Sequence, residues 1–188
     1  MQFVLNFRNC AIAVILLVGG YYCYRNVFAD VDSKDVAALI RAHRRAPHSR
    51  QMILKRRILS VYDSARDHDT VARCLDSASI QTQALAIEIF AESVEQRAVP
   101  KLLEMLRDPT RDDLVKETLA AAFTSLRAEA AVPRLVELTD TSEGPGVRSA
   151  AHRTLRSLTG AGGQIKLSKA TRQHWEIWLR NQKSSSAR

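Results

Sequence analysis

The sequence has few of the residues on which disulfide-rich, collagen-like or disordered chains depend. It holds three cysteines, seven glycines and five prolines among 188 residues. Cys10 and Cys23 lie in an apolar N-terminal stretch, so the remaining chain has Cys74 alone and no second cysteine for an intrachain disulfide. Hydrophobic residues make up 46% of the chain and charged residues 26%, an ordinary globular composition. We therefore expect a folded body without disulfides.

The sequence also lacks the short motifs that carry common enzyme chemistry. It contains no His-Glu-x-x-His, no Gly-Lys-Ser/Thr after a glycine-rich loop, and no Gly-x-Ser-x-Gly. Asp63 and Asp67-His68-Asp69 could hold a metal only if further ligands converged from elsewhere. We therefore predict that the protein is not an enzyme, that it has no cofactor or metal, and that it has no small-molecule substrate.

One long hydrophobic run interrupts this pattern near the N-terminus. The run is uncharged, extends from Cys10 to Tyr24, and lies between Arg8 and Arg25. A signal peptide would be cleaved after Ala29, giving a secreted or periplasmic protein. A membrane anchor would use residues 3–24, although the core run is shorter than the roughly 20 residues of a typical span. We predict an anchor or signal in residues 1–29 with the body outside the cytoplasm, and a cytoplasmic-facing body is the alternative.

Two copies of one motif organise the rest of the chain. Ala98-Val99-Pro100 returns as Ala131-Val132-Pro133, and the residues that follow each copy also match. Each copy predicts a first helix that begins at the proline, because proline is tolerated in a first helical turn. The predicted core of the first helices is Leu102, Leu103, Leu106, Leu135, Val136 and Leu138. The predicted core of the second helices is Leu114, Val115, Leu119, Ala122, Phe123, Leu126, Val147, Ala150, Ala151, Thr154, Leu155 and Leu158.

An earlier, divergent unit precedes these two. Its first helix is predicted from Asp69 to Leu75 and its second from Gln81 to Ser93. Phe90 precedes Phe123 by the same interval that separates Pro100 from Pro133. A helix pair cannot cover its own apolar faces, and about three stacked repeats are usually needed for stability.

Residues 66–160 resemble the HEAT-like repeats, of the PBS-lyase type and of bacterial origin. The resemblance rests on Val-Pro-Lys/Arg-Leu-Leu/Val-Glu followed by Val-Lys/Arg. It implies an all-α solenoid of about three helix pairs whose second helices line a concave surface. Residues 30–65 are predicted to be a basic helical cap, with helices from Asp35 to Arg45 after a Ser33 cap and from Ser49 to Ala65. Residues 161–182 are predicted to be a linker and a Trp-containing capping helix, and residues 183–188 a disordered tail.

The positive charge is concentrated at the two ends of the body. Residues 36–62 hold seven basic residues and no acidic one, whereas residues 98–160 hold nine of each. A basic stretch soon after an apolar segment is suited to an anionic lipid surface. The basic residues that would contact such a surface are Arg41, Arg44, Arg45, Arg50, Lys55, Arg56 and Arg57. Stacking aromatic residues are absent from this stretch and the repeats are neutral, so nucleic acid is not the predicted partner.

A second candidate site lies on the second helices of the repeats. Arg148, His152 and Arg156 follow one line at i, i+4 and i+8, and Lys116 is the equivalent of Arg148 one repeat earlier. The resemblance places these four residues in the groove, where an acidic partner peptide or a phosphate would bind. The predicted function is a membrane-tethered or exported protein-interaction scaffold. The alternatives are a lipid-surface adaptor that uses residues 41–57, or an enzyme-associated protein similar to bilin lyases or to nucleic-acid-binding relatives.

Overall fold

The computed structural model describes residues 33–161 and 165–186, and helices with their connecting turns make up these residues without any strand. The chain divides into two compact units, Met1–Tyr62 and Asp63–Arg188. The predicted anchor or signal in residues 1–29 lies outside the described residues. Within the described residues, none of the helices combines the length and the hydropathy needed to cross a membrane.

The first unit is a helical hairpin of α2 (Val36–Arg45) and α3 (His48–Val61). Asp35, not Ser33, caps α2: an Asp35 carboxylate oxygen accepts the Ala37 amide at 2.9 Å. Ser33 instead accepts the Asp35 amide at 3.1 Å, one step earlier. The second predicted helix is shorter than expected, because the chain leaves α3 at Tyr62 and Ala65 belongs to the next helix.

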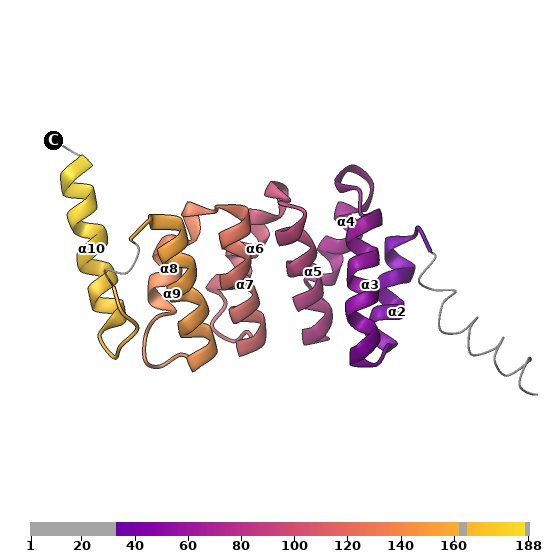
Figure 1. Ribbon diagram of the computed structural model, residues 1–188, viewed down its shortest axis with the longest axis horizontal. Helices are drawn as coiled ribbons and strands as arrows, with labels where there is room; N and C mark the ends of the chain where they lie inside the picture. Colours follow the sequence, from indigo (N-terminus) through magenta and orange to yellow (C-terminus); the bar gives the residue numbers. More distant parts are fainter. Residues whose placement is uncertain (1–32, 162–164, 187–188) are drawn as a thin grey trace, which may run out of the picture. The chain divides into compact units, whose positions relative to one another are not determined.

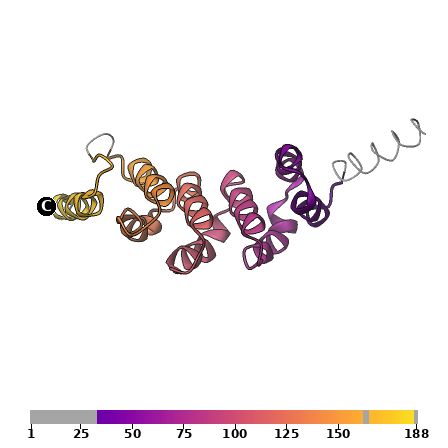
Figure 2. The same cartoon turned by 90° about the horizontal axis from the view of Figure 1, so that it is seen from below.

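The second unit consists of three helix pairs and one closing helix (Figure 1). The pairs are α4 (Ser64–Cys74) with α5 (Ile80–Glu92), α6 (Val99–Arg107) with α7 (Asp113–Leu126), and α8 (Val132–Glu137) with α9 (Pro145–Thr159), followed by α10 (Thr171–Ser186). Figure 2 shows α5, α7 and α9 in one layer and the first helix of each pair in the other. The arrangement of the described helices is consistent with the predicted helical solenoid.

Most of the predicted core is buried, with differences at the helix ends. Leu102, Leu106, Leu119, Phe90 and Phe123 are fully buried. Predicted core residues Leu103 and Leu158 are only half-buried, and Leu114 is 48% exposed in the first turn of α7. The helix α4 begins before the predicted Asp69, at Ser64, because the Asp63 carboxylate accepts the Ala65 amide at 2.9 Å and so caps it.

Each of the second helices is followed by a residue with a positive φ angle. Val94, Arg127 and Gly160 have φ angles of 52°, 49° and 68°, which place each in the left-handed region. The three residues follow one another at the spacing of the Ala-Val-Pro copies. After α5, the Glu95 amide donates to the Phe90 carbonyl at 2.9 Å; after α7, the Ala128 amide donates to the Phe123 carbonyl at 3.2 Å. After α5 and α7 this is the Schellman type of helix end, which turns the chain toward the next pair. After α9 the Gly160 amide instead donates to the Arg156 carbonyl at 3.1 Å.

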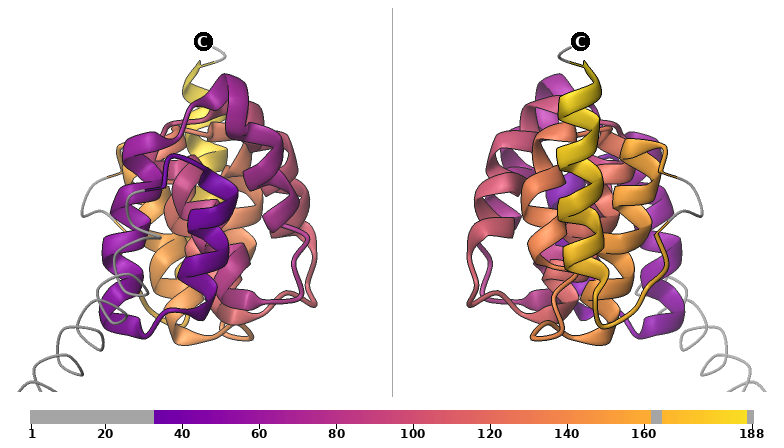
Figure 3. Two further views of the ribbon diagram at one scale, coloured as in Figure 1. Left: turned by 90° about the vertical axis from the view of Figure 1, so that its right-hand side faces the viewer. Right: turned by 90° about the vertical axis from the view of Figure 1, so that its left-hand side faces the viewer.

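The helix α10 closes the second unit. It lies beside α8 and α9 at the C-terminal end of the stack (Figures 1 and 3), and Trp175 is fully buried there. Trp178 and Leu179 are half-buried. The helix begins at Thr171 and ends at Ser186, so it extends past the predicted end at Asn181 into the predicted tail 183–188.

Candidate interaction surface

Lys116, the predicted groove residue on α7, makes an ion pair inside the protein. Its side chain is 8% exposed, and its Nζ lies 3.1 Å from Glu143 Oε2 in the loop before α9. A buried ammonium group is stable only with a partner, which Glu143 supplies. Lys116 thus connects α7 to the following repeat.

His152 and Arg148 on α9 contact the C-terminal segment. Trp175 Nε1 donates to His152 Nδ1 at 3.1 Å, and the two buried rings meet edge to face. Burial of the imidazole, together with the nearby charge of Arg156, lowers the pKa of His152, which keeps it neutral and able to accept this bond. Arg148 Nη2 donates to the Ser168 carbonyl at 3.1 Å. These two predicted groove residues therefore hold the segment that leads into α10.

A different set of side chains faces solvent on the second helices. Because α7 and α9 pack side by side, equivalent positions of the repeats lie in line. The exposed residues of this layer include Ala121 and Ser125 on α7, and Arg153, Arg156 and Ser157 on α9. We call these five residues the α7–α9 face. It brings small side chains together with positive charge, and of the four predicted groove residues it contains Arg156.

The positions on α5 that correspond to this face carry the opposite charge. Glu88 is equivalent to Ala121, and Glu92 is equivalent to Ser125. Glu92 is exposed and Glu88 half-buried, and both make further contacts within the protein. The layer of second helices thus changes from acidic on α5 through small and neutral on α7 to basic on α9.

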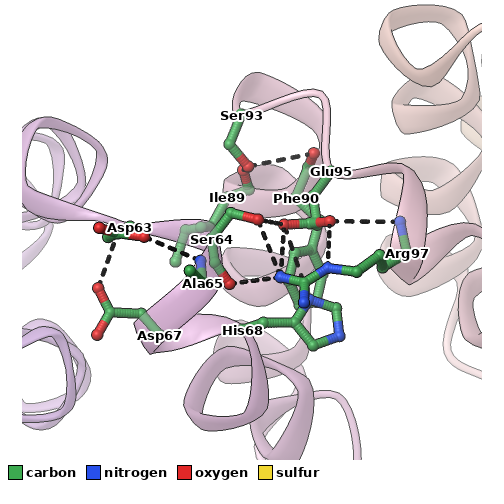
Figure 4. A network of polar contacts seen from close by, with 10 residues as sticks. All are labelled: Asp63, Ser64, Ala65, Asp67, His68, Ile89, Phe90, Ser93, Glu95 and Arg97. Atoms are coloured by element: carbon green, nitrogen blue, oxygen red, sulfur yellow. Dashed lines mark hydrogen bonds and ion pairs between the residues drawn. The ribbon is translucent and has the colours of Figure 1, made fainter.

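A polar network around the buried Glu95 lies at the other end of the second unit (Figure 4). Glu95 accepts hydrogen bonds from the Ser64 hydroxyl and, at 3.0 Å, from Arg97 Nε, while Arg97 also donates to the Ser64 carbonyl. His68 Nδ1 lies 3.8 Å from Glu95 Oε2, and its ring stacks at a tilt on Phe90 with centroids 5.2 Å apart. The network joins the start of α4 to the turn after α5.

The Glu95 network brings a serine, a histidine and a carboxylate together without the geometry of a nucleophile. The Arg97 guanidinium, despite the burial of the carboxyl, lowers the pKa of Glu95 to about 2, with help from the Ser64 hydroxyl. Such a carboxylate is too weak a base to take the Ser64 proton near neutral pH, and Ser64 donates to Glu95 and not to His68. The arrangement suits a structural tie between elements.

The predicted anionic-surface residues all lie on the hairpin of the first unit. Arg41, Arg44, Arg45 and Arg56 are exposed, whereas Arg50, Lys55 and Arg57 are half-buried. The structure brings Arg41, Arg45 and Arg50 to the rim of one depression of about 360 Å³. The other four basic residues do not line it. Across the described part of the chain, no group of three acidic, histidine or cysteine side chains is arranged to hold a metal ion.

Sequence reasoning missed the internal partners of the charged residues. The signal for one of them was present: a Trp on an apolar helix face needs an acceptor for its indole N–H when it is buried. His152 on the preceding helix is such an acceptor. Arg153, the residue after His152, was not among the predicted groove residues, because it does not share the i, i+4, i+8 line of Arg148, His152 and Arg156.

Comparison with known proteins bears on the repeats. A family model described as HEAT repeats matches residues 69–156, which run from within α4 into α9. No curated protein and no solved structure matches the chain significantly. The match supports the HEAT part of the resemblance, while a PBS-lyase type and a bacterial source stay predictions. The stacked, regularly spaced helix pairs agree with this match, and both support HEAT repeats in residues 69–156.

Proposed function

We propose that this protein is a non-catalytic scaffold that binds a partner protein through the α7–α9 face. HEAT repeats generally mediate protein–protein interaction, and stacked repeats provide extended binding surfaces. The observation that carries the proposal is that some polar residues of the second helices make contacts inside the protein while others face solvent. Lys116 and His152 serve internal contacts, whereas Arg153 and its small neighbours face solvent.

The chemistry of this face favours an acidic segment of the partner. Arg153 offers a planar group that pairs with a carboxylate through two hydrogen bonds. Ala121 and Ser125 lie at the equivalent positions and in line with it, and their small size lets a partner backbone approach α7 closely. Glu88 and Glu92 on α5 would repel an acidic segment of the partner. We therefore expect this segment to bind over α7 and α9.

The proposal includes a tether for the scaffold. The apolar run in residues 3–24 is taken as a membrane anchor, or as an export signal that is cleaved after Ala29, with the repeats outside the cytoplasm. Determining the mature N-terminus of the expressed protein distinguishes these two. An intact Met1 in the membrane fraction supports the anchor, and a chain that starts at Asp30 in the soluble fraction supports the signal peptide.

Site-specific cross-linking tests the position of the binding surface. A photoactivatable amino acid at Ser125 in the full-length protein is expected to cross-link to a partner in the native host. The matched control is the same amino acid at Glu104, an exposed residue of α6 in the other layer. Equal cross-linking at both positions, or cross-linking at Glu104 alone, would place the partner elsewhere.

Charge reversal tests the partner chemistry. Arg153→Glu is expected to weaken binding of the cross-linked partner about tenfold or more, because it places like charge against an acidic segment. Arg107→Glu on α6 is the control, since it makes the same change of net charge at an exposed residue of the other layer. A partner whose affinity responds equally to the two variants does not bind through Arg153.

A further inference from the structure

Two large apolar side chains lie next to each other on the solvent side of α3 in the first unit. Met52 is 52% exposed and Ile53 is 53% exposed. Among the large hydrophobic residues that the structure describes as exposed, these two are the pair that adjoin in the sequence. The buried residues of α3, Leu54 and Ile58, lie on its other face. Exposed apolar residues that stand together indicate an interaction surface, whereas single ones do not.

The residues around this pair are polar or basic. Ser49 lies one turn before Ile53, Arg56 lies one turn after Met52, and Ser60 follows one turn later, and all three are exposed. We call Ser49, Met52, Ile53, Arg56 and Ser60 the α3 outer face. It combines apolar side chains with positive charge and contains no carboxylate.

Three exposed arginines supply the positive charge. Arg56 lies on the α3 outer face, and Arg44 and Arg45 end α2 at the turn that leads into α3. Within the described residues, the side chains of these three arginines have no hydrogen-bond or ion-pair partner. Residues 36–62 contain no acidic residue that would neutralise them. The face is therefore suited to a negatively charged ligand.

The other basic residues of the hairpin have partners within the protein. Arg41 Nη2 lies 3.8 Å from Asp35 Oδ2, and further contacts are made by Arg50, Lys55 and Arg57. The attraction to a ligand is therefore carried by the three unpaired arginines. Such attraction extends over about 8 Å at physiological ionic strength, so the two arginines at the end of α2 act without touching the ligand.

We propose that the α3 outer face docks on a bilayer that contains anionic phospholipid, with Met52 and Ile53 inserted at the level of the headgroups. Apolar side chains of a helix that lies along a membrane enter its interface, and basic residues near them attract anionic lipid. Two apolar side chains are too few for a stable protein interface, which buries about 800 Å² on each partner. Nucleic acid is disfavoured, because the face has no aromatic side chain to stack on a base.

The position of this face in the chain agrees with a membrane partner. Val36, where α2 begins, is the twelfth residue after Tyr24, where the apolar N-terminal run ends. A chain of that length spans at most about 40 Å, so an inserted run would keep the hairpin near the bilayer. The docking itself needs neither this anchor nor the α7–α9 face, since a chain that is cleaved after Ala29 retains α3.

Methionine methyl NMR of the full-length protein with lipid nanodiscs tests the docking. The chain has three methionines, Met1, Met52 and Met105, and Met52→Leu identifies the Met52 signal. Nanodiscs with phosphatidylglycerol and a trace of nitroxide-labelled phosphatidylcholine are expected to broaden the Met52 signal. Met105 is 2% exposed and serves as the internal control. With nanodiscs of phosphatidylcholine and the same label, the broadening of Met52 should be at least about fivefold weaker.

Matched variants separate the α3 outer face from general positive charge. Arg44→Gln, Arg45→Gln and Arg56→Gln together are expected to lower the equilibrium constant for docking about a hundredfold, because each basic residue near an anionic surface contributes about fivefold. The control makes the same change of net charge at three exposed residues of the second unit: Arg107→Gln, Lys166→Gln and Lys169→Gln. It is expected to change the equilibrium constant less than about twofold.

A second pair of variants tests the apolar contact. Ile53→Ser is expected to weaken the broadening of Met52 at least about threefold, because less apolar surface enters the membrane. Ile177→Ser on α10 is the control, since Ile177 is 44% exposed in the second unit. Circular dichroism checks that both proteins keep their helices.

Three results would overturn the proposal. They are an unbroadened Met52 signal with phosphatidylglycerol nanodiscs, equal broadening with the two kinds of nanodisc, and equal effects of a variant and its control. The first of these would assign the exposed pair to a protein partner. None of them affects the proposed scaffold function, because the cross-linking and charge-reversal experiments use residues of the second unit.

Discussion

The left-handed residues at the ends of the second helices show how single positions serve the repeat. Gly160 adopts this conformation without strain, because it has no Cβ and nothing lies within 4 Å of where one would be. Val94 adopts nearly the same φ with a β-branched side chain, which is disfavoured. The Schellman end thus overrides local preference at Val94, and the repeat period makes it necessary there.

Replacing Val94 with glycine should stabilise the protein. The Val94 side chain is 53% exposed, so its removal loses little buried area, while the strain of the left-handed conformation is relieved. We expect Val94→Gly to raise the free energy of unfolding by about 1 kcal/mol, measured by chemical denaturation. Gly160→Ala is the reciprocal test and should lower it by about 1 kcal/mol. A destabilised Val94→Gly protein would show that side-chain packing matters more than backbone strain.

The buried carboxylate of Glu95 should contribute to stability in a pH-dependent way. Its pKa is lowered from 4.5 to about 2, so its contribution is complete above pH 4.5 and is lost as pH falls toward 2. Glu95→Gln keeps the size of the side chain and removes the charge that Arg97 and Ser64 bind. We expect a loss of about 2 kcal/mol at neutral pH in urea denaturation.

Glu104→Gln provides the control for Glu95, because Glu104 is exposed on α6. It should change the free energy of unfolding by less than about 0.5 kcal/mol. If Glu95→Gln and Glu104→Gln have the same free energy of unfolding, the charge of Glu95 does not stabilise the protein.

At the scale of the elements, α10 is attached through a few specific contacts. The Trp175 indole binds the neutral ring of His152 on α9, and Arg172 Nη1 lies 3.3 Å from Asp140 Oδ2 after α8. One contact therefore goes to α9 and the other to the loop that follows α8. Because the acceptor is an imidazole, the attachment is sensitive to pH.

Acidification should weaken the docking of α10. Because the pKa of His152 is lowered in the folded protein, the unfolded chain binds a proton at this residue more readily than the folded one. The contribution of neutral His152 to the free energy of unfolding is therefore complete above pH 6.5 and is lost as the pH falls below 6.5. We expect the free energy of unfolding to fall by about 1 kcal/mol between about pH 7.5 and pH 5 from this group. Tryptophan fluorescence reports on it directly, because both tryptophans of the chain, Trp175 and Trp178, lie on α10.

His152→Gln keeps a hydrogen-bond acceptor that does not titrate, so the pH dependence in this range should be reduced. His174→Gln is the matched control, since His174 lies on the exposed side of α10. This variant should keep the pH dependence of the free energy of unfolding. A pH dependence that survives His152→Gln would have to come from another group.

At the scale of the whole molecule, the second unit is a linear array in which each helix pair contacts its neighbours. The contacts that join successive repeats include Thr154 Oγ1 to the Ala120 carbonyl at 2.8 Å and Arg134 Nε to the Leu106 carbonyl at 3.0 Å. In such an array, stability is a sum of repeat and interface terms, so a loss at one end should be felt most by the nearest repeat.

Removing the closing helix should therefore destabilise the last pair first. A chain that ends after Ala161 exposes the surface of α9 that Trp175 covers. We expect amide hydrogen exchange in α8 and α9 to accelerate about tenfold or more, with a much smaller change in α5. A chain that ends after Gln182 retains Trp175 and should exchange like the intact protein. Uniform acceleration along the unit would contradict the array model and indicate a single cooperative fold.

The sequence by itself determined the class of fold and its register. The regular return of the Ala-Val-Pro motif required stacked helix pairs, because one pair cannot bury residues such as Phe90 and Phe123. Helix boundaries shifted where a side chain outside the pattern competes for a cap, as Asp35 and Asp63 do. Such caps depend on local geometry that apolar periodicity does not report.

Only the tertiary structure decided which charged residues make contacts between distant parts of the chain. The line Arg148, His152 and Arg156 is continuous on the isolated α9 helix, but the docking of α10 uses two of its members. In the same way, the basic stretch 41–57 is one run in the sequence, and the turn at Pro47 brings Arg50 to the same depression as Arg41 and Arg45. Periodicity tells which stripe of a helix is polar, whereas burial of that stripe depends on neighbours that are distant in the chain.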